Sequence, residues 1–249
     1  MNAVVKGGLV VVGCYLFFLL SGCPADRVVP RLPLPPELHL TGITGSIWHG
    51  EVDRVDWRNT TLRKVSWSLP ISSFLLFQPA IQLTFADPNS LMGRAEVRLL
   101  NPPKAQDVSL KANADWLQTR GGIALPVTLS GKVQLELEEL EMAPNGCVTL
   151  DGALNWSGAG LNSQFGNVQL DKAKADLSCE KGKIIAKIKQ HSEQLAIEGK
   201  AEITLPAAYH LVGTLTPGKG LPDSLSQGLS FLGQRDSQGR VRLDFSGRF

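Results

Sequence analysis

The 249-residue chain has almost no net charge and no run of like charge. It carries 25 Lys and Arg against 23 Asp and Glu, and its basic residues are scattered along the sequence. Proteins that bind nucleic acid concentrate basic residues in a patch or stripe on one face. Because this chain has no such patch, its sequence argues against nucleic acid as a partner.

The sequence also lacks the motifs of common catalytic and metal chemistry. It contains no GxSxG, HExxH or P-loop, and no GxGxxG after a predicted strand. Cysteine and histidine number four each, and their spacing matches no CxxC or Cys/His zinc pattern. We therefore expect no catalytic residues, no cofactor, no metal site and no enzymatic activity.

One acidic cluster invites a catalytic interpretation, since Glu136, Glu138, Glu139 and Glu141 lie close together in sequence. The cluster occupies the polar face and the end of a predicted strand. Charges at such positions discourage edge-to-edge pairing of sheets. A solvated strand edge is therefore the better interpretation of the cluster.

What the chain does contain is a regular alternation of apolar and polar residues. In the segment 40–69, three tryptophans, Trp48, Trp57 and Trp67, recur at nearly even spacing, and each ends a short alternating run. Alternation with a period of two predicts half-buried β-strands. The segment is predicted to be a three-stranded meander whose indoles need a cover from the rest of the chain.

The same alternation continues to the C-terminus, interrupted by residues typical of turns. Asp151-Gly152 is predicted to be a hairpin turn, and 115–122 a loop. Two stretches have helical spacing of apolar residues, 70–79 and 221–232, where Leu221, Leu225, Leu229 and Leu232 recur. The sequence thus predicts an all-β fold of roughly a dozen strands with two short helices.

The N-terminus predicts a membrane anchor at residues 1–23. Gly7 to Cys23 contains 17 residues without a charge, preceded by Lys6. A spanning helix needs about 20 apolar residues, with a lower limit of about 17. Residues 24–39 follow as a Pro-rich spacer, since three prolines in 33–36 favour an extended chain. Residues 40–249 form the predicted β-rich domain.

Three kinds of anchor remain open for this segment. A retained signal anchor is favoured, with Lys6 in the cytoplasm and the remainder exported. Alternatively, the sequence around Cys23, Leu-Ser-Gly-Cys, looks like a lipobox, which makes Cys23 a candidate lipidation site. A cleaved signal peptide is the third reading, although no small-x-small site follows the apolar core. Each alternative places residues 30–249 outside the cytoplasm.

Two cysteines lie in the predicted exported domain. Cys147 and Cys179 are 32 residues apart. In an oxidising compartment they most simply form one disulfide, and two buried free thiols are the alternative.

Several short segments together resemble type II secretion system protein N. They are Pro24-Ala25-Asp26, the Arg-Leu-Pro-Leu-Pro-Pro-Glu-Leu spacer, Thr44 to Gly50, Trp67-Ser68-Leu69, 125–131, the pair Cys147 and Cys179, Phe231-Leu232-Gly233, Gly239-Arg240, and Phe245 to Arg248. The order of these segments carries the resemblance, which covers essentially the whole chain. Cys23 departs from the family pattern.

The resemblance implies a single-pass protein of the bacterial inner membrane, with a cytoplasmic N-terminus and a periplasmic domain. It would be an accessory component of the type II secretion system, partnered by other components, that supports assembly of the machine exporting folded proteins. More remotely, the family is similar to AsmA-type proteins, which implies an elongated curved antiparallel sheet or trough. The alternative function is lipid binding or transfer by such a trough. Its candidate apolar binding face comprises Trp48, Trp57, Trp67, Phe74 and Phe77.

Overall fold

The structure is a computed structural model of the chain. It describes residues 22–57, 60–70, 72–73, 77–87, 89, 91–99, 102–120, 127–163, 166–204, 208–222, 225–226, 229 and 235–248. The predicted anchor therefore lies outside the described residues except for Gly22 and Cys23, and so does Phe74. Among the residues that are described, none of the helices has the length and apolar character needed to cross a membrane.

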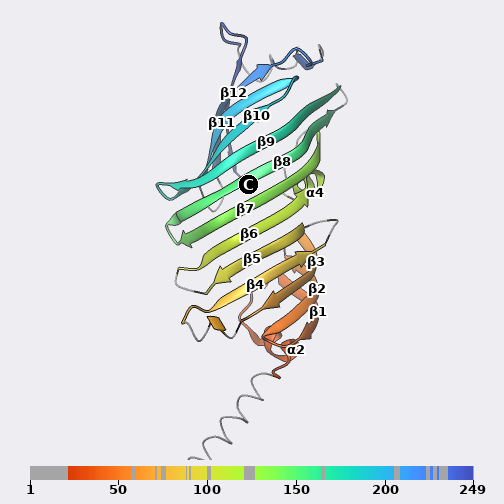
Figure 1. Cartoon of the computed structure of the whole chain (residues 1–249), viewed down its shortest axis with the longest axis vertical. Helices are drawn as coiled ribbons and strands as arrows, with labels where there is room; N and C mark the ends of the chain where they lie inside the picture. The colour runs from red at the N-terminus through yellow and green to blue at the C-terminus, as the bar shows by residue number, and fades with distance from the viewer. Residues whose placement is uncertain are drawn as a thin grey trace, which may run out of the picture. The chain divides into compact units, whose positions relative to one another are not determined.

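The described chain is dominated by antiparallel β-structure and divides into two compact units. Unit 1 spans Met1–Ala86 and unit 2 spans Asp87–Phe249. In each unit the strands pair with their neighbours in sequence order (Figure 1). The prediction of an all-β fold with roughly a dozen antiparallel strands is confirmed, since thirteen are present in the described chain.

The described part of unit 1 is a four-stranded meander preceded by two helical turns. Its elements are α2 (Ala25–Val28), η1 (Val29–Arg31), β1 (Leu38–Gly45), β2 (His49–Trp57), β3 (Thr60–Ser68) and β4 (Ala80–Ala86). Ala25 is fully buried where α2 packs against β1. The carbonyl of Cys23 accepts a hydrogen bond from the Ile47 N–H at 3.1 Å. The first half of the predicted Pro-rich spacer, 24–39, thus packs against the sheet of this unit.

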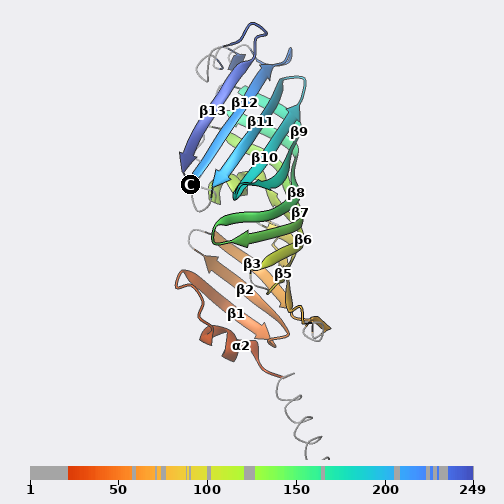
Figure 2. The ribbon, with the colours of Figure 1, turned by 90° about the vertical axis from the view of Figure 1, so that its left-hand side faces the viewer.

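Among its described residues, unit 2 has nine strands and the short helix α4. Its elements are β5 (Leu91–Arg98), β6 (Lys104–Asn113), α4 (Ala114–Arg120), β7 (Thr128–Ala143), β8 (Gly146–Ser163), β9 (Gly166–Glu180), β10 (Lys183–His191), β11 (Leu195–Thr204), β12 (Ala208–Pro217) and β13 (Val241–Arg248). In Figure 1 the viewer looks onto β6 to β9, whereas in Figure 2, which is turned by 90°, the viewer looks onto β10 to β13. The sheet of unit 2 is therefore strongly curved.

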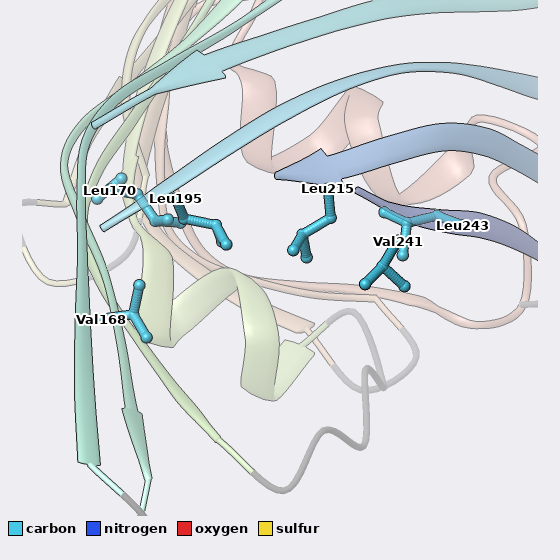
Figure 3. Close-up of a cluster of buried hydrophobic side chains, with 7 residues drawn as sticks. Val168, Leu170, Leu195, Leu215, Val241 and Leu243 are labelled. Carbon is cyan, nitrogen blue, oxygen red and sulfur yellow. The ribbon is translucent and has the colours of Figure 1, made fainter. Parts of the chain in front are cut away.

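The curvature brings distant strands of unit 2 into one buried cluster. Figure 3 shows Val168 and Leu170 of β9 facing the same interior as Leu215, Val241 and Leu243 of β12 and β13. Val241 is fully buried, and so is Ala159 of β8, which belongs to the same cluster. A flat sheet could not join β8 to β13, which are five strands apart, so the curl itself creates this core.

The hairpin predicted at Asp151-Gly152 is wrong, because both residues lie inside the 18-residue strand β8. Gly152 faces Leu137 of β7, and a Cβ at this glycine would lie 2.5 Å from the carbonyl oxygen of Glu136. The register of β7 against β8 shifts between Leu137 and Glu139 at this place. Gly152 therefore permits the backbones of β7 and β8 to approach closely at a β-bulge, and it does not make a turn.

The loop predicted at 115–122 is also wrong, because Ala114–Arg120 forms α4. Asp115 lies in its first turn, where a negative charge favours the helix dipole. The Gln118 side chain donates to the Val127 carbonyl at 2.6 Å and accepts from the Leu129 N–H at 2.9 Å. This seven-residue helix is too short to show periodicity, and it is held by contacts with the start of β7.

Candidate binding face

The apolar residues of unit 2 share one face of its curved sheet, which we call the inner face. Register partners run from Leu110 to Leu135, Leu154, Ala175 and Ile188 across five successive strands. Directly opposed residues in antiparallel strands point to the same side of a sheet. The alternation in the sequence thus becomes a continuous apolar stripe.

The chain itself covers one part of the inner face. Leu221, Leu225 and Leu229 pack against the buried cluster of β8 to β13. The Leu225 N–H donates to the Pro222 carbonyl at 3.0 Å, as in the first turn of a helix. These three leucines belong to the helical pattern predicted over 221–232, of which the remainder lies largely outside the described residues. The pattern identified a cover for the sheet.

A second buried cluster surrounds a disulfide. Cys147 and Cys179 are bonded, with their Cα atoms 5.7 Å apart, so the free-thiol alternative is excluded. The β8–β9 pairing begins at Asp151 and Ser178, and the disulfide therefore joins the two strands just beyond the end of their ladder. Leu137 and Leu150 are buried beside Cys147.

In unit 1, the predicted aromatic face is only partly assembled. The Trp67 indole lies over Gly50, where a Cβ would come 2.2 Å from Cζ2 of the ring. Its Nε1–H donates to the Ile47 carbonyl at 3.0 Å, between β1 and β2. Trp48 lies in the same connection, and its carbonyl accepts from the Leu69 N–H at 2.7 Å. Trp48 and Trp67 are therefore held at one end of the meander.

The other two described aromatic residues of the predicted face are exposed. Trp57, at the far end of β2, is 54% exposed, and Phe77, just before β4, is 89% exposed. The structure therefore does not gather Trp48, Trp57, Trp67 and Phe77 into one patch. Whether any of them binds a ligand stays a prediction.

The opposite, outer face of unit 2 is charged. Lys200 of β11 lies 3.0 Å from the Glu180 carboxylate, and Lys183 lies 3.0 Å from Glu202. Hydrogen bonds from Lys183 and Lys200 hold the pKa of the Glu202 carboxyl below its usual range. The hydrogen bond to Glu180 raises the pKa of Lys200. Part of the acidic cluster is paired as well, because Lys104 lies 2.6 Å from Glu139 and 4.0 Å from Glu141.

The sequence did not predict a hollow of about 690 Å³ where β9 and β10 separate. Their pairing ends at Ala173 and Gln190, and beyond it the Gln190 and Ser192 side chains donate to carbonyls of β9 at 3.0 and 2.9 Å. The walls of the hollow carry Lys172, Lys174, Lys189, His191, Glu136 and Glu198. The separation of two strands depends on contacts between residues distant in sequence, so no short stretch of sequence could have predicted this hollow.

Together, the described fold and its two faces define an antiparallel β-protein with an apolar inner face and a charged outer face. Residues 36–244 match the family described as Type II secretion system (T2SS), protein N. The chain belongs to this family.

Relatives of similar length carry the same description. Type II secretion system protein N of Aeromonas hydrophila is 37% identical over 94% of both chains. The protein of Pectobacterium carotovorum subsp. carotovorum is 31% identical over 97% of this chain and 96% of its own. The protein of Vibrio cholerae is 29% identical over 100% of both. No solved structure matches the chain.

Proposed function

We propose that this protein is an accessory inner-membrane component of the type II secretion system whose periplasmic β-domain supports assembly of the machine. The observation that carries this proposal is the family match over residues 36–244, nearly the whole predicted exported part. The disulfide between Cys147 and Cys179 supports an oxidising compartment for unit 2. The uncharged segment 7–23 supports an anchor that places this unit across the membrane from Lys6.

The cover over the inner face favours a scaffold over a lipid carrier. A trough that holds acyl chains needs apolar walls open to the ligand, whereas Leu221, Leu225 and Leu229 fill that side of the β8–β13 cluster. A sheet face that packs against another segment of the same chain contributes to stability. Contacts with partner proteins are then made by the edges and the outer face of the sheet. The lipid-binding trough remains the second candidate, supported by the apolar stripe from Leu110 to Ile188.

Co-purification tests the two functions together. A C-terminally tagged chain is expressed at native level in its host, membranes are solubilised in mild detergent, and protein and lipid in the eluate are both quantified. We expect other secretion components to be enriched, with no stoichiometric phospholipid on the washed protein. About one phospholipid per chain and no secretion component would overturn the scaffold and favour the carrier. An untagged host supplies the background.

The intact mass from the same preparation decides the anchor. A chain that begins at residue 1 indicates a retained signal anchor. A chain that begins at a diacylated Cys23 indicates a lipoprotein and would contradict the predicted spanning helix. A Cys23→Ser variant is the matched control, since it blocks lipidation and leaves the apolar segment otherwise unchanged.

A further inference from the structure

β13 is the last strand of the sheet and pairs with β12 on one side (Figure 2). The pairing runs without a register shift from Val241 opposite Leu215 to Arg248 opposite Ala208. On the second side, Arg235 bridges to Val241 and covers only the first residue of the strand. From Arg242 to Arg248, no described residue pairs with this side of the backbone.

This edge lacks three of the devices that usually protect an exposed strand. Edge strands are commonly blunted by proline, by a β-bulge or by a charged side chain on the buried face. β13 contains no proline and no bulge, and its inner face carries Val241, Leu243, Phe245 and Gly247. Phe245 is 41% exposed although Leu243, two residues earlier, is buried. The apolar stripe of the inner face thus ends at an edge that no described residue pairs with beyond Val241.

The outer face of the same strand carries two arginines, Arg242 and Arg248, on either side of Asp244. Asp244 is held by His210 of β12, with Nε2 and Oδ1 3.0 Å apart. Arg242 and Arg248 are exposed, and neither has an ion pair with any other described residue. A hollow of about 580 Å³ lies beside Arg242, and its walls also carry Glu198 and the ion pair of Arg240 with Asp236. The edge therefore offers two cationic side chains that lie six positions apart in the strand.

We propose that β13 binds an extended segment of a partner protein by strand addition. The segment has apolar residues at alternate positions and one acidic residue at each end. In an antiparallel arrangement, residues facing Leu243, Phe245 and Gly247 continue the inner face and are apolar. Residues facing Arg242 and Arg248 lie six positions apart in the partner and are acidic. The unpaired backbone supplies hydrogen bonds, and the two arginines set the register.

This inference deepens the proposed function by naming the kind of partner that a scaffold would hold. It does not depend on which secretion component carries the segment. A second copy of this chain is the competing occupant of the edge.

The test uses the full chain in detergent and a fluorescent peptide, Glu-Val-Thr-Val-Thr-Val-Glu. We expect saturable binding by anisotropy. Two further peptides are N-methylated, one at the odd-numbered and one at the even-numbered residues, so that each has a different edge of its backbone blocked. One of these two peptides should no longer bind. The R242E/R248E variant should bind at least about tenfold more weakly, because two attractive pairs become repulsive. A peptide with Lys at both ends should recover that loss.

The matched control is R63E/R94E, which makes the same charge change at two exposed arginines on β3 and β5. It should leave affinity for the acidic peptide unchanged. Absence of saturable binding, or equal binding of both N-methylated peptides, would overturn the proposal. A dimer by sedimentation that excludes the peptide would assign the edge to a second copy instead. Either result leaves co-purification with secretion components unaffected, so the two proposals can fail separately.

Discussion

Units 1 and 2 use the same antiparallel meander, yet they bury their apolar side chains to different degrees. Among the described residues, Ala25, Val52 and Ala80 are the buried apolar residues of unit 1, and all others belong to unit 2. Both buried clusters and the disulfide lie in unit 2. Exposed large apolar side chains occur in both units, for example Trp57 and Phe77 in unit 1 and Val148 and Phe245 in unit 2, so the difference lies in the buried residues.

The difference shows what curvature and covering segments add to a sheet. A four-stranded meander buries one face only if another layer packs on it. Unit 2 supplies this layer from its own strands and from the leucines at 221–229, whereas the described part of unit 1 has only α2 and η1 beside its sheet. We therefore expect unit 2 to carry most of the stability of the exported part.

The largest expected effect comes from removing the disulfide. The C147A/C179A variant should lose about 3–4 kcal/mol of unfolding free energy, because the bond closes a loop of 32 residues in the unfolded chain. Urea unfolding should show the loss in unit 2, with protease sites of unit 1 unchanged. Cys23→Ala is the control and should unfold like the parent protein. Equal destabilisation by C147A/C179A and Cys23→Ala would contradict a stabilising disulfide between Cys147 and Cys179.

A core truncation in each unit compares their packing directly. Leu195→Ala in the unit 2 cluster should cost about 3 kcal/mol, as expected for a fully buried leucine. Leu40→Ala on the half-buried face of β1 should cost less, about 1 kcal/mol, because water already reaches that side chain. Both are measured by urea unfolding. Equal costs would show that unit 1 has a cover beyond α2 and η1.

The contact between Gly50 and Trp67 tests the best-packed point of unit 1. Gly50→Ala places a Cβ against the indole and should cost about 1–3 kcal/mol through overpacking. The Trp67 ring should move toward solvent, which a red shift of fluorescence emission would report. In a Trp67→Leu background, Gly50→Ala should cost much less. A full cost in that background would place the strain elsewhere.

The smallest effect is expected from pH, because solvent reaches the groups concerned, Glu202 and Asp56, and screens their charges. The pKa of Glu202 is lowered by Lys183 and Lys200, so its contribution to stability is complete above its unfolded pKa near 4.5 and is lost on acidification. Asp56 of unit 1, with a pKa lowered by hydrogen bonds from Thr61 and Arg54, follows the same sign.

Thermal unfolding from pH 7 to pH 3 measures the pH-dependent contribution of Glu202 to stability. Glu202→Gln should flatten the acid-side decrease of Tm for unit 2 and leave unit 1 unchanged. Glu193→Gln, at an exposed turn residue, is the matched control. An unchanged slope in Glu202→Gln would show that the ion pairs contribute nothing measurable, as is common for exposed pairs.

The sequence predicted the features that depend on neighbours along the chain. Alternation identified the strands and their apolar face, and the spacing of Leu221, Leu225 and Leu229 identified residues that cover the core. The errors occurred where a long-range contact changes the meaning of a local signal. Gly152 looked like a turn residue because its partner, the main chain of Glu136, is distant in sequence.

By itself, the sequence determined an all-β protein with a segregated apolar face, because strand periodicity is a local property. It also determined the family, through the order of many weak segments. Only the tertiary structure decided that the sheet of unit 2 curls until β8 and β13 share one core. It also decided that, beyond Val241, no described residue pairs with the second side of β13. Curvature arises from twist and bulges summed over many strands, and no short stretch of sequence contains that sum.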